Sequence, residues 1–269
     1  MRDLDAINPQ IARPNTLTSY LFFLPFFSGL GGWALATGAA PTVAYEDNAL
    51  AVFSIRLLIG SLILAPLPWL LKWDWRSRYF GSGAFLLGSA ALVGLIPLLC
   101  IVLYGRLPRV LSWGFLLFEM GLIVWWCRRF VLLYRRIFAD TELWKRIYVE
   151  ESDVVYYLQR ADKWAMEEKF KVSQMPSTML TLLPMIIAFL LVPFMSSVTR
   201  FVGVPFTHIF LTIAGIPIVL LCLGGATRGY LIFYYYPWKI KRATGKNVYV
   251  DMASWPQDLD VTAQTNRNG

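Results

Sequence analysis

The sequence has 269 residues, of which 57% are hydrophobic and 16% charged, and its formal net charge at pH 7 is +8. A soluble domain carries about a quarter charged residues, so this composition excludes an ordinary water-soluble protein. Apolar runs of about 20 residues recur along the chain, and a helix of that length crosses the hydrocarbon layer of a bilayer. We therefore expect an all-α membrane protein, a polytopic bundle of six transmembrane helices.

The six expected spans fall into two groups. A polar N-terminal tail, residues 1–17, precedes a four-helix part at 18–127 and a two-helix part at 178–238. Between these parts, we expect residues 128–177 to form a helical segment in the cytoplasm, and residues 239–269 to form a cytoplasmic tail. The individual spans are expected at about 19–37, 50–71, 84–104, 110–127, 178–197 and 206–226.

Two features predict how the spans pack. In the first span, Ser28, Gly32 and Ala36 recur at every fourth position, which places them on one helical face. Small residues at this spacing let a second membrane helix approach closely. The third and fourth spans are joined by a very short connection, residues 105–109, so we expect them to be antiparallel neighbours.

The fourth span differs from the others because it contains no proline. Proline removes a backbone hydrogen bond and tends to kink a helix, so the other spans are expected to bend. Neither glycine nor proline occurs from residue 122 to residue 175. The fourth span is therefore predicted to continue past its end in the membrane as a stiff cytoplasmic stalk.

The basic residues predict the orientation of the chain. Of its 25 Lys and Arg, 21 fall on the side that holds both termini and residues 128–177, and three fall on the other side. Loops rich in Lys and Arg stay in the cytoplasm, so we place both termini there. The lack of a cleavable signal and of an Asn-x-Ser/Thr sequence favours a bacterial inner membrane.

Two charged residues, Arg56 and Glu119, lie well inside expected spans. A charge at the bilayer centre costs about 2.5–3.5 kcal/mol on insertion scales, so each is expected to have a partner. On the expected topology their depths differ by only about 5 Å, which allows an ion pair. In the alternative interpretation, Arg56 extends to the outer interface, and Glu119 is protonated or bound to a backbone group.

Few other residues are candidates for chemistry. His208, the sole histidine, stands near the outer start of the sixth span, where an interfacial polar residue is a simpler interpretation than a proton relay. Cys100, Cys127 and Cys222 lack any metal-binding or disulfide spacing. Known catalytic motifs are missing, so we expect no enzyme activity, no metal and no cofactor. Because topology explains the basic charge, no nucleic acid is expected either.

Residues 128–177 include the side chains expected to contact lipid or a partner. Two arginine pairs suit anionic lipid headgroups. Ser152 or Asp153 is expected to begin an amphipathic helix that has Asp162 on its polar side. Its apolar face is covered either by a partner protein or by the chain's own bilayer or loops. The expected contact residues are Arg128, Arg129, Arg135, Arg136, Tyr157 and Trp164, and the apolar face comprises Val154, Leu158, Ala161 and Ala165.

The C-terminal part leaves one alternative open. Residues 230–238 read YLIFYYYPW, an aromatic run that either continues the sixth helix or lies at the membrane–water boundary. Residues 248–250 favour a short extended piece, and the last nine residues favour disorder.

Together these features predict a non-enzymatic subunit or scaffold of a larger membrane assembly, in a secretion, conjugation or envelope system. Its partners would be the anionic bilayer and other membrane or cytoplasmic proteins. Two alternatives remain at this point. One is a small transporter or channel that uses Arg56 and Glu119, and the other is a membrane immunity or exclusion protein.

Overall fold

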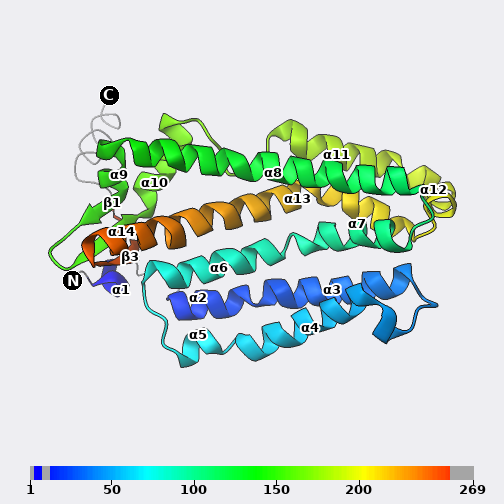
Figure 1. Cartoon of the computed structure of the whole chain (residues 1–269), viewed down its shortest axis with the longest axis horizontal. Coiled ribbons are helices and arrows are strands. Elements are labelled where there is room, and N and C mark those ends of the chain that lie inside the picture. The colour runs from blue at the N-terminus through cyan, green and yellow to red at the C-terminus, as the bar shows by residue number, and fades with distance from the viewer. Residues whose placement is uncertain (1–2, 8–12, 255–269) are drawn as a thin grey trace.

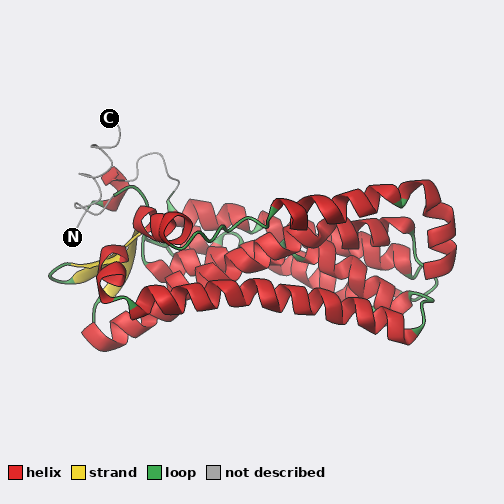
Figure 2. Ribbon diagram, turned by 90° about the horizontal axis from the view of Figure 1, so that it is seen from above, coloured by secondary structure: helices red, strands yellow, loops and turns green. Residues whose placement is uncertain are grey.

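The computed structural model describes residues 3–7 and 13–254. Long helices lie side by side in an elongated bundle, and short helices and strands gather at one end (Figure 1 and Figure 2). We call residues 141–169 and 236–251 the cap, and the opposite end of the bundle the far end. The disorder predicted for residues 261–269 lies outside the described part.

The bundle is built from helices that pack along one another. They are α2 (Pro14–Leu21), α3 (Phe23–Ala39), α4 (Ala49–Leu64), α5 (Leu67–Leu70), α6 (Ser77–Ser89), α7 (Leu92–Tyr104), α8 (Arg109–Ala139), α11 (Thr178–Leu190), α12 (Met195–Val202) and α13 (Phe206–Tyr230). Short 3₁₀ turns, η1 (Tyr45–Asp47) and η3 (Val192–Phe194), accompany α4 and α11.

The cap contains short helices and three strands. These are α9 (Thr141–Ile147), β1 (Tyr148–Glu150), β2 (Val154–Leu158), α10 (Gln159–Trp164), the π-helical turn η2 (Ala165–Lys169), α14 (Tyr236–Thr244) and β3 (Asn247–Asp251). A second π-helical turn, η4 (Leu231–Tyr235), joins α13 to α14. The short α1 (Leu4–Ile7) is tied to the loop before α6, because Trp75 Nε1 donates to Asp5 Oδ1 at 3.0 Å.

Several of these helices have the length and composition of membrane spans. Within the described residues, five helical stretches are long and apolar enough to cross a membrane, and α6 with α7 makes a sixth if the pair counts as one span. Large apolar side chains such as Leu117, Phe118 and Met179 are exposed on the bundle surface, where lipid would cover them. The expectation of an all-helical bundle that includes several candidate membrane spans is therefore confirmed.

The third expected span is bent by 42° between α6 and α7. The bend lies at Ala90 and Ala91, whose backbone N–H groups bond only three residues back, to Leu87 and Gly88. Pro97 lies inside α7 without interrupting it. Proline content therefore does not locate the break in this span.

Two helices continue from the bundle into the cap. The 31 residues of α8 run without a break past both arginine pairs, which confirms that the fourth span continues as one helix beyond its apolar part. Likewise, α13 continues through η4 and α14, so residues 230–238 extend the sixth helix. Figure 1 shows both helices reaching the cap.

The cap sheet corrects the prediction for residues 152–165. Its strand order is β1-β2-β3, with β1 antiparallel and β3 parallel to β2. The helix expected to begin at Ser152 or Asp153 is therefore wrong over Val154–Leu158. The sequence of β2, VVYYL, is β-branched and aromatic, which suits a strand. The extended piece expected at residues 248–250 is confirmed as part of β3.

The cores of the two ends differ in composition. The cap-end core is rich in large aromatic residues, including Trp126, Tyr134, Tyr148 and Tyr156. Small side chains dominate where α3 meets α4 and α7: Ser28 and Ala36 are buried, and a Cβ on Gly32 would lie 2.4 Å from Ile96 Cδ1. The small-residue stripe predicted for the first span is thus confirmed as a close-packing face.

Candidate functional site

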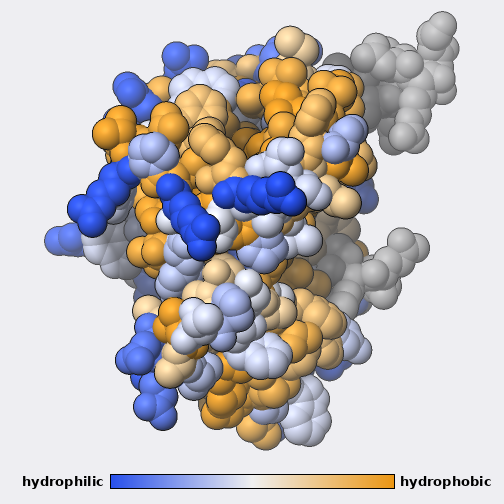
Figure 3. Space-filling view, turned by 90° about the vertical axis from the view of Figure 1, so that its right-hand side faces the viewer, coloured by the Kyte–Doolittle hydropathy of each residue, from blue (hydrophilic) through white to orange (hydrophobic). Residues whose placement is uncertain are grey.

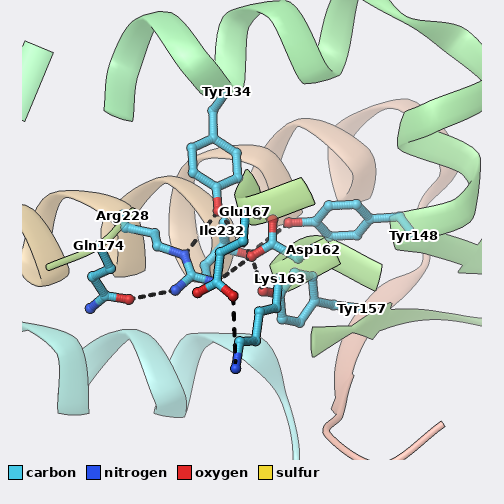
Figure 4. Close-up of polar contacts among 9 residues, drawn as sticks. All are labelled: Tyr134, Tyr148, Tyr157, Asp162, Lys163, Glu167, Gln174, Arg228 and Ile232. Atoms are coloured by element: carbon cyan, nitrogen blue, oxygen red, sulfur yellow. Dashed lines mark hydrogen bonds and ion pairs between the residues drawn. The ribbon is translucent and has the colours of Figure 1, made fainter. Parts of the chain in front are cut away.

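A buried ion pair joins the cap to the bundle. Asp162 belongs to α10 in the cap, and Arg228 belongs to the last turn of α13. The Arg228 Nη2 atom lies 2.5 Å from Asp162 Oδ2, and their side chains are 13% and 0% exposed (Figure 4). The expectation that Asp162 faces solvent is therefore wrong. A carboxylate so enclosed needs several donors to offset its lost hydration.

Two tyrosines supply further donors to this carboxylate. The Tyr134 hydroxyl, from α8, lies 2.8 Å and 2.9 Å from the two oxygens of Asp162. The Tyr157 hydroxyl, from β2, donates to Oδ2 at 2.9 Å. Tyr134 also accepts a hydrogen bond from Arg228 Nε at 3.0 Å. The carboxylate is thus satisfied by groups from a strand and from the two helices that enter the cap.

Arg228 also binds the segment that leads from the cap to α11. Its Nη1 atom donates to Gln174 Oε1 at 2.6 Å, so one guanidinium contacts Asp162, Tyr134 and Gln174 at once. The planar fork of arginine donors makes such simultaneous contacts possible. We call Tyr134, Tyr157, Asp162, Gln174 and Arg228 the junction cluster.

Two buried tyrosines of the cap, Tyr148 and Tyr157, are held in their neutral form. Burial raises the pKa of Tyr157 well above its usual range, and the negative charge of Asp162 raises it further. Burial and the same carboxylate also raise the pKa of Tyr148, whose hydroxyl donates to the Ile232 carbonyl at 2.8 Å. Both phenols therefore act as fixed hydrogen-bond donors at neutral pH.

A cavity of about 240 Å³ opens beside the junction cluster. Tyr157, Gln174 and Arg228 line its polar side, and side chains of α2, α6 and α13 line the apolar remainder. Because Arg228 is already engaged by Asp162, Tyr134 and Gln174, the arrangement fixes the position of the cap on the bundle. Chemically, it is a positioning network rather than a set of free acids and bases.

The structure does not bring Arg56 and Glu119 together. Arg56 is exposed on α4, which packs chiefly on α3, whereas α8 packs on α7 and α13. Figure 1 shows α4 and α8 on opposite sides of the bundle. Glu119 is 4% exposed, and its Oε1 atom has no hydrogen-bond partner. The ion pair that the sequence allowed is therefore not formed, because α3 and α7 lie between the two helices, and the exposed Arg56 agrees with the alternative interpretation.

The predicted contact residues of the central segment lie in different environments. Arg128, Arg135 and Arg136 are exposed on α8. Arg129 is half-buried, and its guanidinium carbon lies 4.4 Å from the centre of the Trp126 ring, a cation–π contact. The arginine pairs thus leave three of their four cations at the surface.

The two aromatic contact residues are not part of an open face. Tyr157 is fully buried in the junction cluster, so it is not available to a partner, and Trp164 is half-buried against the cap core. For Tyr157 the prediction is wrong, because a strand-to-helix change at Leu158 places its ring in the core. The period of a continuous helix does not apply across that change.

The polar residues of the far end hold helices to one another. His208 is 1% exposed, with Nε2 at 2.9 Å from the Leu35 carbonyl and Nδ1 at 3.2 Å from the Pro205 carbonyl. It therefore joins α13 to α3 instead of lying free at an interface. The three cysteines are unpaired, and the described residues contain no group of His, Cys, Asp or Glu that would hold a metal ion.

The junction cluster is not predicted by local sequence patterns. Asp162 and Arg228 are 66 residues apart, and a helical period through residues 154–165 turned Asp162 outward. One signal was available: Arg228 follows directly on the sixth span, where a cation at the end of an apolar helix needs an acceptor.

No family model matches the chain, and neither a curated protein nor a solved structure matches it.

Proposed function

We propose that this chain is a non-enzymatic, multi-pass membrane subunit or scaffold that presents its cap to a partner in a larger membrane assembly. The observation that carries the proposal is the junction cluster, which ties α8, α10 and α13 into one unit. Two unbroken helices therefore transmit their position in the membrane directly to the cap. Such a connection suits a protein that places a docking surface at a fixed height above the bilayer.

The outward side of the cap supplies the docking surface. Arg160, Lys163, Glu167 and Glu168 are exposed there, while Asp162 and Tyr157 on the inward side are buried. Mixed charges on a rigid helix favour recognition by a partner of complementary charge. The single ion pair between Lys163 and Glu167 spans 3.9 Å in solvent and holds these residues only weakly.

The setting in this proposal is a bacterial inner membrane, with the cap and both termini in the cytoplasm, in a secretion, conjugation or envelope system. The concentration of Lys and Arg at the cap end supports that orientation. Labelling with a membrane-impermeant maleimide tests it in intact cells. Glu46→Cys at the far end should react, and the matched Glu142→Cys in the cap should not. Reaction of Glu142→Cys alone would reverse the orientation.

Purification in mild detergent tests the scaffold role. Wild-type chain should co-elute with partner proteins, and the double variant Arg160→Glu with Lys163→Glu should lose them. The matched control, Arg106→Glu with Arg109→Glu, makes the same charge change at exposed positions of the far end and should retain them. A wild-type chain that elutes alone, or equal losses in both variants, would contradict the proposal.

A further inference from the structure

A second cavity lies at the cap end, away from the junction cluster. It occupies about 270 Å³ between the start of α6, helix α14 and strand β3, which lie together in Figure 1. Three cations line it, Arg76, Arg78 and Lys241, together with Tyr234 and Trp238. We call this cavity the basic groove.

An aromatic crevice continues from the basic groove. Its volume is about 500 Å³, and it is lined only by aromatic side chains. The two cavities share Tyr234 and Trp238, so they lie side by side, and we call them together the depression. The lining residues of the crevice are Phe85, Tyr230, Tyr234, Tyr235 and Trp238.

We propose that this depression binds one anionic phospholipid, whose phosphate lies in the basic groove and whose acyl chains lie over the aromatic crevice. The chemistry of the two parts matches the two parts of such a lipid. Arginine and lysine donors recognise phosphate oxygens, and tyrosine and tryptophan rings favour the membrane–water boundary. This inference goes beyond the scaffold role, because it holds whether or not a partner covers the cap.

The charges in the groove are arranged to receive an anion. Arg76 is fixed by Tyr249, whose hydroxyl accepts from Nε at 3.3 Å, and by Asp74 at 3.2 Å. Arg78 donates to the Tyr79 hydroxyl at 2.7 Å, and that contact involves no carboxylate. Lys241 is exposed. Asp74 thus offsets one of the three cations and leaves the groove positive.

The level of the depression also fits a lipid. Tyr230 is the last residue of α13, and Phe85 belongs to α6, one part of the bent span candidate. The crevice therefore borders the apolar part of the bundle, while Lys241 and Asn247 belong to the cap. A phospholipid spans the same boundary, because its acyl chains lie in the hydrocarbon and its charged headgroup lies outside it.

Binding of purified full-length chain to detergent micelles doped with phosphatidylglycerol or phosphatidylcholine tests the headgroup part. Wild type should prefer phosphatidylglycerol, and Arg78→Gln with Lys241→Gln should weaken that binding about tenfold or more. The matched control, Arg109→Gln with Lys145→Gln, removes the same residue types at other exposed positions and should bind as wild type does. Equal weakening in both variants would overturn the site.

Two further arms separate a lipid from free phosphate. Phosphatidylglycerol with brominated acyl chains should quench tryptophan fluorescence, and Trp238→Phe should remove part of that quenching while circular dichroism stays unchanged. Millimolar inorganic phosphate should not displace the lipid. Displacement by inorganic phosphate, or quenching unaffected by Trp238→Phe, would overturn the lipid assignment. Loss of partner proteins has no bearing on either readout, so the two proposals fail separately.

Discussion

The two ends of the bundle are held together by different chemistry. At the cap end, a buried carboxylate and guanidinium bind one another and two tyrosines. At the far end, the buried side chains of Asn48 and His208 instead bind backbone carbonyls. Figure 3 views the far end, where hydrophilic side chains are interspersed among apolar ones. Among the described residues, the buried ion pair thus lies at the end where the cap encloses it.

The difference follows from what each end can offer a buried charge. Ionic groups inside hydrocarbon are costly unless several donors and acceptors surround them. The cap supplies such groups from β2 and α10, so an ion pair is accommodated there. The far end has no comparable layer of polar groups in the described residues. There an uncharged amide, which costs less to bury than an ion pair, links the helices. Asn48 Nδ2 donates to the Ala36 carbonyl at 2.9 Å, and Oδ1 accepts from Tyr104 at 2.8 Å.

Removing the cation from the junction cluster should have the largest effect. Arg228→Met leaves Asp162 buried without its charged partner, which costs about 3–5 kcal/mol for such pairs. We expect the cap to lose protection from hydrogen exchange in β2 and α10 while the far end keeps it. Thermal unfolding in detergent gives the matching loss of overall stability.

A surface pair and a compensating variant serve as controls for this prediction. Lys163→Met breaks the exposed pair with Glu167 and should cost at most about 1 kcal/mol. Arg228→Met with Asp162→Leu removes both charges, so it should recover much of the loss. If Arg228→Met cost no more than Lys163→Met, the contrast between the two ends would not hold.

Close packing at the α3–α4 contact should give the next largest effect. A Cβ on Gly29 would lie 2.7 Å from the Ser54 carbonyl oxygen and 2.8 Å from Leu58 N. Because both are backbone atoms, Gly29→Leu forces the helices apart, at about 1–3 kcal/mol. Gly31→Leu on the same helix has no heavy atom within 4 Å of its Cβ and should unfold near the wild-type temperature. Equal unfolding temperatures for the two variants would contradict tight packing here.

This small-residue contact was predictable from the sequence, whereas the junction cluster was not. The spacing of Ser28, Gly32 and Ala36 is local, so one helical period places the face. Asp162 and Arg228 meet through the tertiary fold of the cap, in which β2 pairs with β3, nearly a hundred residues further along the chain. Local periodicity carries no information about such a pairing, and it assigned residues 154–158 to a helix. The stalk was predictable because the absence of glycine and proline is also a local property.

Polar contacts at the far end should contribute less than those at the cap. Asn48 caps α4, since its side chain accepts from Ala51 N at 3.0 Å. Asn48→Ala removes this cap and the bonds to Ala36 and Tyr104, at about 1–2 kcal/mol. Tyr104→Phe removes only one of these bonds and should cost less. Thermal unfolding of the two variants gives the order, and a loss for Asn48→Ala as large as that for Arg228→Met would reverse the comparison.

Alkaline pH should weaken the cap slightly and by a mechanism specific to its buried tyrosines. Burial and the charge of Asp162 raise the pKa of Tyr148 and of Tyr157, so the folded cap keeps both phenols protonated above pH 10. Unfolded tyrosines ionise near pH 10, so the unfolded state then binds fewer protons, and stability falls as pH rises. The loss is at most about 1.4 kcal/mol per tyrosine in the first pH unit.

Unfolding midpoints in denaturant at pH 9, 10 and 11 measure this loss of stability. Tyr148→Phe should make the decline shallower, whereas Tyr20→Phe, which alters a tyrosine that is 63% exposed, should not. A decline of the same slope in both variants would mean that the buried phenols do not set the alkaline limit.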